Sequence, residues 1–130
     1  MTHRTYFDIN GNFTAPPVTA STPVITVSAS GAAQALTVPA QGDRAYDIVL
    51  TANCALSLTG GSAGVAQTVH LWLRQAGGGG FTPALPAGVK WPVGGPPVPG
   101  TAAGQIDVYK FTTLDGGATF TGERVFVYGG

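Results

Sequence analysis

The one stretch of this chain that resembles catalytic machinery is Gly60-Gly61-Ser62-Ala63-Gly64. It fits the G-x-S-x-G pattern, in which a sharp turn between a strand and a helix exposes a nucleophilic serine. Here a strand-like segment follows the pattern, and 130 residues are too few for the sheet and helices of an α/β-hydrolase. Because a loop of small residues matches such a pattern easily, we interpret this segment as a loop.

The histidines and the cysteine lack the neighbours that metal or thiol chemistry needs. His3 and His70 are the two histidines, and one strand histidine with scattered aspartates does not make a zinc or iron site. Cys54 is the single cysteine and lies in the apolar segment LTANCALSL, so we expect a buried small hydrophobic residue and no intrachain disulfide. No metal and no cofactor is therefore expected.

Two aspartates, Asp107 and Asp115, bracket a predicted strand. The dipeptide Asp115-Gly116 is a hairpin-turn signal, which explains that aspartate as a turn residue. Asp107 is expected to be partly buried and paired with Lys90 or Arg124. Glycoside hydrolysis needs two carboxyl groups that face each other across a cleft, and the sequence shows no such pair. We therefore expect that the chain is not an enzyme.

Charged residues are scarce and balanced. Six basic and six acidic side chains make up 9% of the chain, against about 25% in typical globular domains. No electrostatic field therefore exists to attract nucleic acid or an anionic membrane. A chain this neutral suits either burial against other chains or a compositional bias toward Gly, Ala and Pro.

Export and membrane signals are also missing from the sequence. The N-terminal segment MTHRTYFDINGNF has no apolar run of the kind that a signal peptide contains, and no segment is apolar for the length of a membrane span. We expect synthesis in a cytoplasm without classical export.

Alternating apolar and polar residues predict strands along most of the chain. The strongest patterns cover residues 46–52, 67–74 and 105–113, in which successive side chains point to opposite faces. Shorter strands are expected at 23–28, 35–38, 81–85, 88–91, 118–121 and 123–128. Residues 94–104, rich in Pro and Gly, are expected to form a loop.

Roughly seven to nine short strands predict an all-β fold, specifically an antiparallel β-sandwich, jelly-roll-like or immunoglobulin-like. The length fits one domain, which we place at residues 23–130. Residues 1–22 are expected to form an extended N-terminal arm, because Gly11, Pro16 and Pro17 interrupt strand pairing. The candidate core residues are Ile48, Leu50, Leu71, Leu73, Trp91, Val108 and Phe111.

Large apolar side chains outside this core mark candidate contact surfaces. On the strand at 67–74, His70 and Trp72 face away from the core, where they fit a subunit contact or stacking on a sugar ring. The arm offers further candidates for contact with a partner or a neighbouring subunit. The complete set of interface candidates is Tyr6, Phe7, Ile9, Phe13, His70 and Trp72.

A further pattern links ordered segments along the chain. They are Leu50-Thr51-Ala52-Asn53-Cys54, residues 71–75 before a run of glycines, Val89-Lys90-Trp91-Pro92 with Gly94-Gly95, Ile106-Asp107-Val108, Phe111, Asp115-Gly116-Gly117 and Gly122. Over residues 45–126 this arrangement resembles a domain found in virion proteins of tailed bacteriophages. Phe120 departs from the pattern, since that family often has tryptophan there.

The resemblance implies a structural or adhesive role, usually as a trimer, in tail fibres, minor tail proteins or capsid-surface proteins. Because the chain is one domain with a short arm and no fibre shaft, we expect a capsid decoration protein. It would bind the major capsid protein as a homotrimer on the virion surface and stabilise the capsid. The alternative is a minor tail or tail-fibre module that binds a host-surface glycan.

Overall fold

The fold consists of strands and loops. The computed structural model describes residues 6–7, 13–14 and 22–129, and these residues contain no helix. The strands are β1 (Tyr6–Phe7), β2 (Phe13–Thr14), β3 (Val24–Val27), β4 (Ala33–Val38), β5 (Arg44–Leu50), β6 (Cys54–Gly60), β7 (Ala63–Gln75), β8 (Pro83–Ala84), β9 (Val89–Lys90), β10 (Ile106–Asp115) and β11 (Phe120–Tyr128). The all-β class predicted from the sequence is confirmed.

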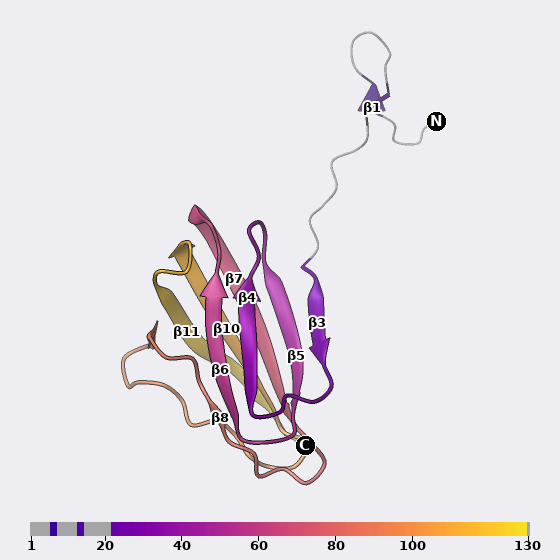
Figure 1. Cartoon of the computed structure of the whole chain (residues 1–130), viewed down its shortest axis with the longest axis vertical. Helices are drawn as coiled ribbons and strands as arrows, with labels where there is room; N and C mark the ends of the chain where they lie inside the picture. Colours follow the sequence, from indigo (N-terminus) through magenta and orange to yellow (C-terminus); the bar gives the residue numbers. More distant parts are fainter. Residues whose placement is uncertain (1–5, 8–12, 15–21, 130) are drawn as a thin grey trace.

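Two sheets share one core. The larger sheet has the strand order β3-β5-β7-β10-β11-β9 and the smaller one the order β4-β6-β8. Figure 1 shows the smaller sheet in front of one face of the larger. Side chains from both sheets form a single buried cluster, which includes Leu36 of β4, Leu56 of β6, Ile48 of β5, Leu71 of β7 and Phe111 of β10.

From β3 to β8, successive strands alternate between the two sheets. The chain crosses to the opposite sheet after each strand and then crosses back, so the next strand in a given sheet runs in the same direction as the last. In this way β3 pairs parallel with β5, β5 with β7, β4 with β6, and β6 with β8. The prediction of an antiparallel arrangement is therefore wrong for these strands, because alternation in sequence indicates which face a residue takes but not the direction of a neighbouring strand.

In the larger sheet, antiparallel pairing begins where β10 enters between β7 and β11. A turn through Asp115 and the glycines at 116 and 117 joins β10 to β11 as a hairpin. The short strand β9 pairs parallel with the beginning of β11, at Phe120 and Thr121. The hairpin therefore brings β11 next to β10, and β10 separates β11 from β7.

Most of the candidate core residues lie in the buried cluster. Its members among them are Ile48, Leu50, Leu71, Leu73 and Phe111. Trp91 is half-buried and packs against the cluster. Val108 is buried outside the cluster, because alternation along β10 turns it to the opposite face, where its register partners are Trp72 and Phe126.

Within the predicted arm, the structure describes a short strand pair and Thr22. In the strand pair Tyr6 lies opposite Thr14, and Phe7 lies opposite Phe13. Ile9, another interface candidate, lies outside the described residues. The strand β3, which follows the arm along the chain, forms one edge of the larger sheet.

Gly117, in the β10–β11 turn, lies where the backbone leaves no room for a side chain. Its φ is +85°, and a Cβ atom there would collide with the carbonyl oxygen of Gly60. Gly31 has a comparable φ of +64°, but a Cβ there would meet nothing within 4 Å.

We expect Gly117→Ala to lower the free energy of unfolding by about 3 kcal/mol or more, and Gly31→Ala by about 1 kcal/mol from φ strain alone. Urea denaturation of both variants measures this difference, and equal losses would contradict the backbone collision.

Candidate interaction surface

The outward face of β7 carries both of the interface candidates predicted on this strand. Leu71 and Leu73 are buried in the core. Because side chains alternate along a strand, His70, Trp72 and Arg74 lie on the face of the larger sheet that the smaller sheet does not cover. His70 and Arg74 are half-buried there, and Trp72 is 36% exposed.

An aromatic patch, defined here as Trp72, Phe126 and Tyr128, covers part of this face. The rings of Trp72 and Tyr128 are stacked, with centroids 6.0 Å apart and planes 19° from parallel. The ring centroids of Phe126 and Tyr128 are 5.9 Å apart. Phe126 is 58% exposed and Tyr128 is 45% exposed. Sequence reasoning missed Phe126 and Tyr128 as members of the surface. The signal that could have found them is their alternation with Val125 and Val127.

An ion pair stands beside the aromatic patch. Arg74 donates to Asp47 through Nε to Oδ1 at 2.5 Å and through Nη2 to Oδ2 at 3.3 Å. The guanidinium also lies over the Trp72 ring, 5.5 Å from its centroid, so the cation is held by both partners. The ion pair and Trp72 border a hollow of about 300 Å³. Its lining residues are Val24, Ala45, Tyr46, Asp47, Trp72 and Arg74.

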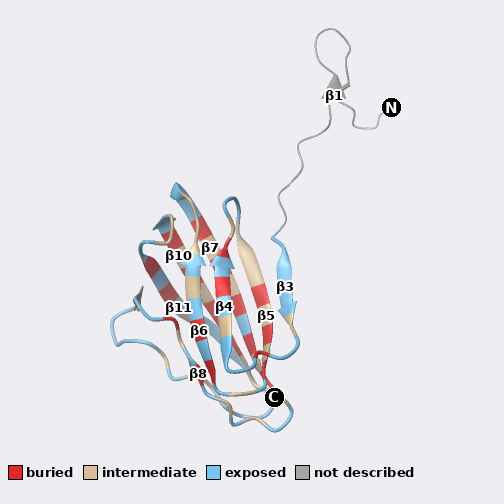
Figure 2. Cartoon of the chain, viewed as in Figure 1, coloured by how far each residue is buried: buried red, intermediate tan, exposed pale blue. Residues whose placement is uncertain are grey.

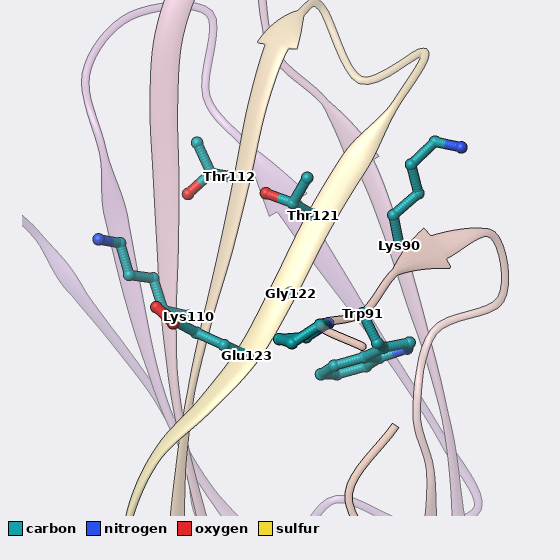
Figure 3. Close-up of a pocket in the computed structure, with 8 residues that line it drawn as sticks. Lys90, Trp91, Lys110, Thr112, Thr121, Gly122 and Glu123 are labelled. Atoms are coloured by element: carbon teal, nitrogen blue, oxygen red, sulfur yellow. The ribbon is translucent and has the colours of Figure 1, made fainter. Parts of the chain in front are cut away.

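A second hollow, of about 350 Å³, lies where β9 joins β11. Trp91 forms part of its wall and is fixed by edge-on packing against Tyr109 and Phe111, with centroid distances of 6.4 and 5.8 Å. Lys90 and Lys110 also line this space, but Figure 3 shows their amino groups pointing away from each other. The two cations therefore do not converge on one point, as a bound anion would require.

Asp107 is a buried carboxylate at the beginning of β10 and is only 2% exposed. It accepts hydrogen bonds from the Gly100 amide at 2.8 Å, from Gln105 Nε2 at 3.0 Å and from the Tyr109 hydroxyl at 3.1 Å. Arg124 Nη1 lies 3.5 Å from Oδ2, so Arg124 is the ion-pair partner where the sequence left Lys90 as an alternative. The network ties the 94–104 loop to β10 and β11.

The Tyr109 hydroxyl is held in its protonated form within this network. Burial raises the pKa of Tyr109 well above its ordinary value, and the nearby Asp107 carboxylate raises it further. The hydroxyl therefore donates to the carboxylate, and its role is to satisfy a buried charge.

Ser62 lies in a loop, as interpreted from the sequence. Its hydroxyl donates to the carbonyl of Ala40 at 2.6 Å, and its amide donates to Gln67 Oε1 at 2.7 Å. The residues after it form the strand β7 where a nucleophile elbow would have a helix. The serine therefore serves to connect two loops.

The remaining candidates for chemistry are spread over the fold. Asp107 and Asp115 are separated by most of β10, which corresponds to about 26 Å at the rise of a strand. The Thr119 amide donates to Asp115 and holds the pKa of this exposed turn carboxyl below its usual value. Cys54 is buried in the core, and His3 lies outside the described residues.

Among residues 6–7, 13–14 and 22–129, no group of three or more His, Cys, Asp or Glu side chains is arranged to hold a metal ion. In the same part of the chain, no helix is long and apolar enough to cross a membrane. Comparison of the chain with protein families, with curated proteins and with solved structures gives no match.

The Asp107 network predicts a large difference between two aspartates. Asp107→Asn removes a buried charge, leaves Arg124 without its partner and turns an amide donor toward other donors, so the free energy of unfolding should fall by about 3 kcal/mol. Asp47→Asn, in the half-exposed pair with Arg74, should cost less than about 1 kcal/mol. Urea denaturation of both variants provides the comparison. A loss at Asp107 no larger than that at Asp47 would show that the network does not hold the loop.

Proposed function

We propose that this chain is a structural protein of a tailed-bacteriophage virion, specifically a decoration protein that binds the outer shell of the capsid as a homotrimer and stabilises it. Its partner is the major capsid protein, and it is made in the cytoplasm of the host bacterium. The observation that carries the proposal is the aromatic patch exposed on the larger sheet. A cluster of exposed aromatic side chains on a chain without net charge suits contact with another protein.

The polar residues of the sequence resemblance support a structural role. Asn53 Oδ1 accepts a hydrogen bond from the Thr82 amide at 2.9 Å. The Gln75 side chain accepts from the Phe81 amide at 3.1 Å and donates to the Phe81 carbonyl at 2.6 Å. Asp107 likewise binds groups of its own chain. Since these side chains fix loops and do not converge on a cavity, we propose a non-enzymatic protein.

A second function is favoured by the ion pair beside Trp72. A sugar ring stacks on an exposed indole, and fixed charged groups at its side bind the sugar hydroxyls. Asp47 and Arg74 supply an acceptor and a donor beside the indole, at a hollow of about 300 Å³. This arrangement supports the alternative of a minor tail or tail-fibre module that binds a host-surface glycan.

Binding to purified phage particles tests the decoration role. The purified protein should co-sediment with phage heads that lack it and should not co-sediment with isolated tails, which serve as the control. Deletion of residues 2–15 should abolish head binding, because the arm carries Tyr6, Phe7, Ile9 and Phe13, and should leave the far-ultraviolet circular dichroism of the sheets unchanged. Unchanged binding by the deletion variant would remove the arm from the interface. Retention by tails alone would contradict decoration, and retention by neither would overturn the virion role.

The glycan alternative predicts a specific effect of Trp72. In a pull-down with host cell walls, Trp72→Ala should weaken binding about tenfold, because the stacking surface is lost. Val65→Ala, at an exposed apolar residue on the same strand outside the aromatic patch, is the matched control and should bind normally. If the unmodified protein does not bind cell walls, or if both variants bind equally well, the glycan alternative is wrong.

A further inference from the structure

The larger sheet has two open edges. One edge is β3, and the other is the second half of β11, because β9 pairs only with Phe120 and Thr121. Within the described part of the chain, no strand pairs with the outer side of β3 or with the outer side of β11 after Thr121. In the strand order these two strands lie toward opposite ends of the larger sheet, and Figure 1 shows β3 at the right of the molecule and the beginning of β11 at the left.

The open part of β11 exposes apolar side chains on both of its faces. The residues concerned are Val125 (41% exposed), Phe126 (58%), Val127 (46%) and Tyr128 (45%). Sheet edges in soluble proteins are commonly protected by Lys, Pro or a covering segment, and residues 125–129 contain neither a proline nor a charged residue. Unpaired backbone groups flanked by apolar side chains are the features that bind an additional strand.

The edge at β3 is also apolar and uncharged, although Pro23 directly precedes the strand. Val24 is 60% exposed and Ile25 is 38% exposed, and residues 22–28 contain no charged residue. Figure 2 shows most of this strand in the colour of exposed residues. The two edges are also matched in length, since β3 has four residues and the open apolar part of β11 covers positions 125–128.

We propose that β3 of one copy of this chain pairs with the open half of β11 of the next copy, and that this head-to-tail contact closes into the trimer. The direction of the strands fits. β3, β5 and β7 are parallel, and β11 runs the same way because it is antiparallel to β10, as β7 is. Continuation of the sheet from one copy to the next therefore pairs β11 with β3 in parallel, as in the pairs at the β3 end of the sheet.

A second copy matches these edges in charge as well as in strand direction and length. A contact between two different patches of the same chain is heterologous, and it closes into a ring when the rotation between copies allows it. Residues 22–28 and 125–129 carry no charge, so pairing these segments costs no like-charge repulsion at the contact; Glu123 and Arg124 lie earlier on β11. The number three rests on the proposed function, whereas the identity of the two edges rests on the structure.

Charge substitution at both edges tests the pairing in the full-length chain. Val24 and Phe126 are the most exposed apolar residues of their edges and lie on the same face of the sheet. Val24→Glu or Phe126→Lys alone would place an unpaired charge against the apolar side chains of the neighbouring edge and should raise the dissociation constant of the trimer about 100-fold or more. The double variant Val24→Glu/Phe126→Lys places opposite charges across each contact and should recover the trimer.

Size-exclusion chromatography with light scattering measures the assembly, and circular dichroism verifies that each variant is folded. Val93→Lys, at a fully exposed loop valine, is the matched control and should remain trimeric. If β11 instead paired with β11 of a twofold-related copy, the double variant would stay dissociated, which would overturn the proposal. A monomeric wild-type protein, or trimeric single variants, would also overturn it. None of these results alters the head-binding assay, so failure of the interface and failure of the decoration role are distinguishable.

Discussion

The buried carboxylate of Asp107 is the interaction on which the β10–β11 end of the fold depends. A charge with 2% exposure is tolerated only when it is paired and its oxygens accept hydrogen bonds. Gly100, Gln105 and Tyr109 supply the three hydrogen bonds, and Arg124 supplies the opposite charge. The 94–104 loop and the two strands of the hairpin therefore form around one group. Asp107 lies in the interior of a domain with few charged residues because one carboxylate there serves as the common partner of the loop, β10 and β11.

On β7, two buried side-chain amides, Gln67 and Gln75, likewise bind loop backbone groups near the two ends of the core. Gln67 donates to the Pro39 carbonyl at 2.7 Å and accepts from the Ser62 amide, and Gln75 exchanges hydrogen bonds with Phe81. Loops that cross between the two sheets are thus fastened to the central strand. The polar side chains that look chemically distinctive in the sequence are engaged in holding the fold. The exposed apolar surface of the larger sheet and its open edges are the features on which the proposed assembly depends.

Local pattern predicted the faces of the main strands but not their partners. Alternation in residues 67–74 correctly predicted that Leu71 faces the core and Trp72 faces away from it. The strand itself begins earlier, at Ala63, within a segment expected to be a loop, because Asp115 of β10 pairs with it. Parallel pairing was not predictable, since it follows from how the chain crosses between sheets. Alternation with Val127 indicates that Phe126 and Tyr128 share a face of β11, but Phe126 comes beside Trp72 only through the strand order β7-β10-β11, which is a property of the whole fold.

We propose that the exposed surface of the larger sheet serves assembly on a phage capsid. The most direct test is the copy number of this protein in purified virions, counted by quantitative mass spectrometry against the major capsid protein. We expect a number comparable to that of the capsid protein, because trimers would be distributed over the shell. A few copies per particle would contradict decoration and indicate a tail component, and absence from the particle would contradict a structural role in the virion.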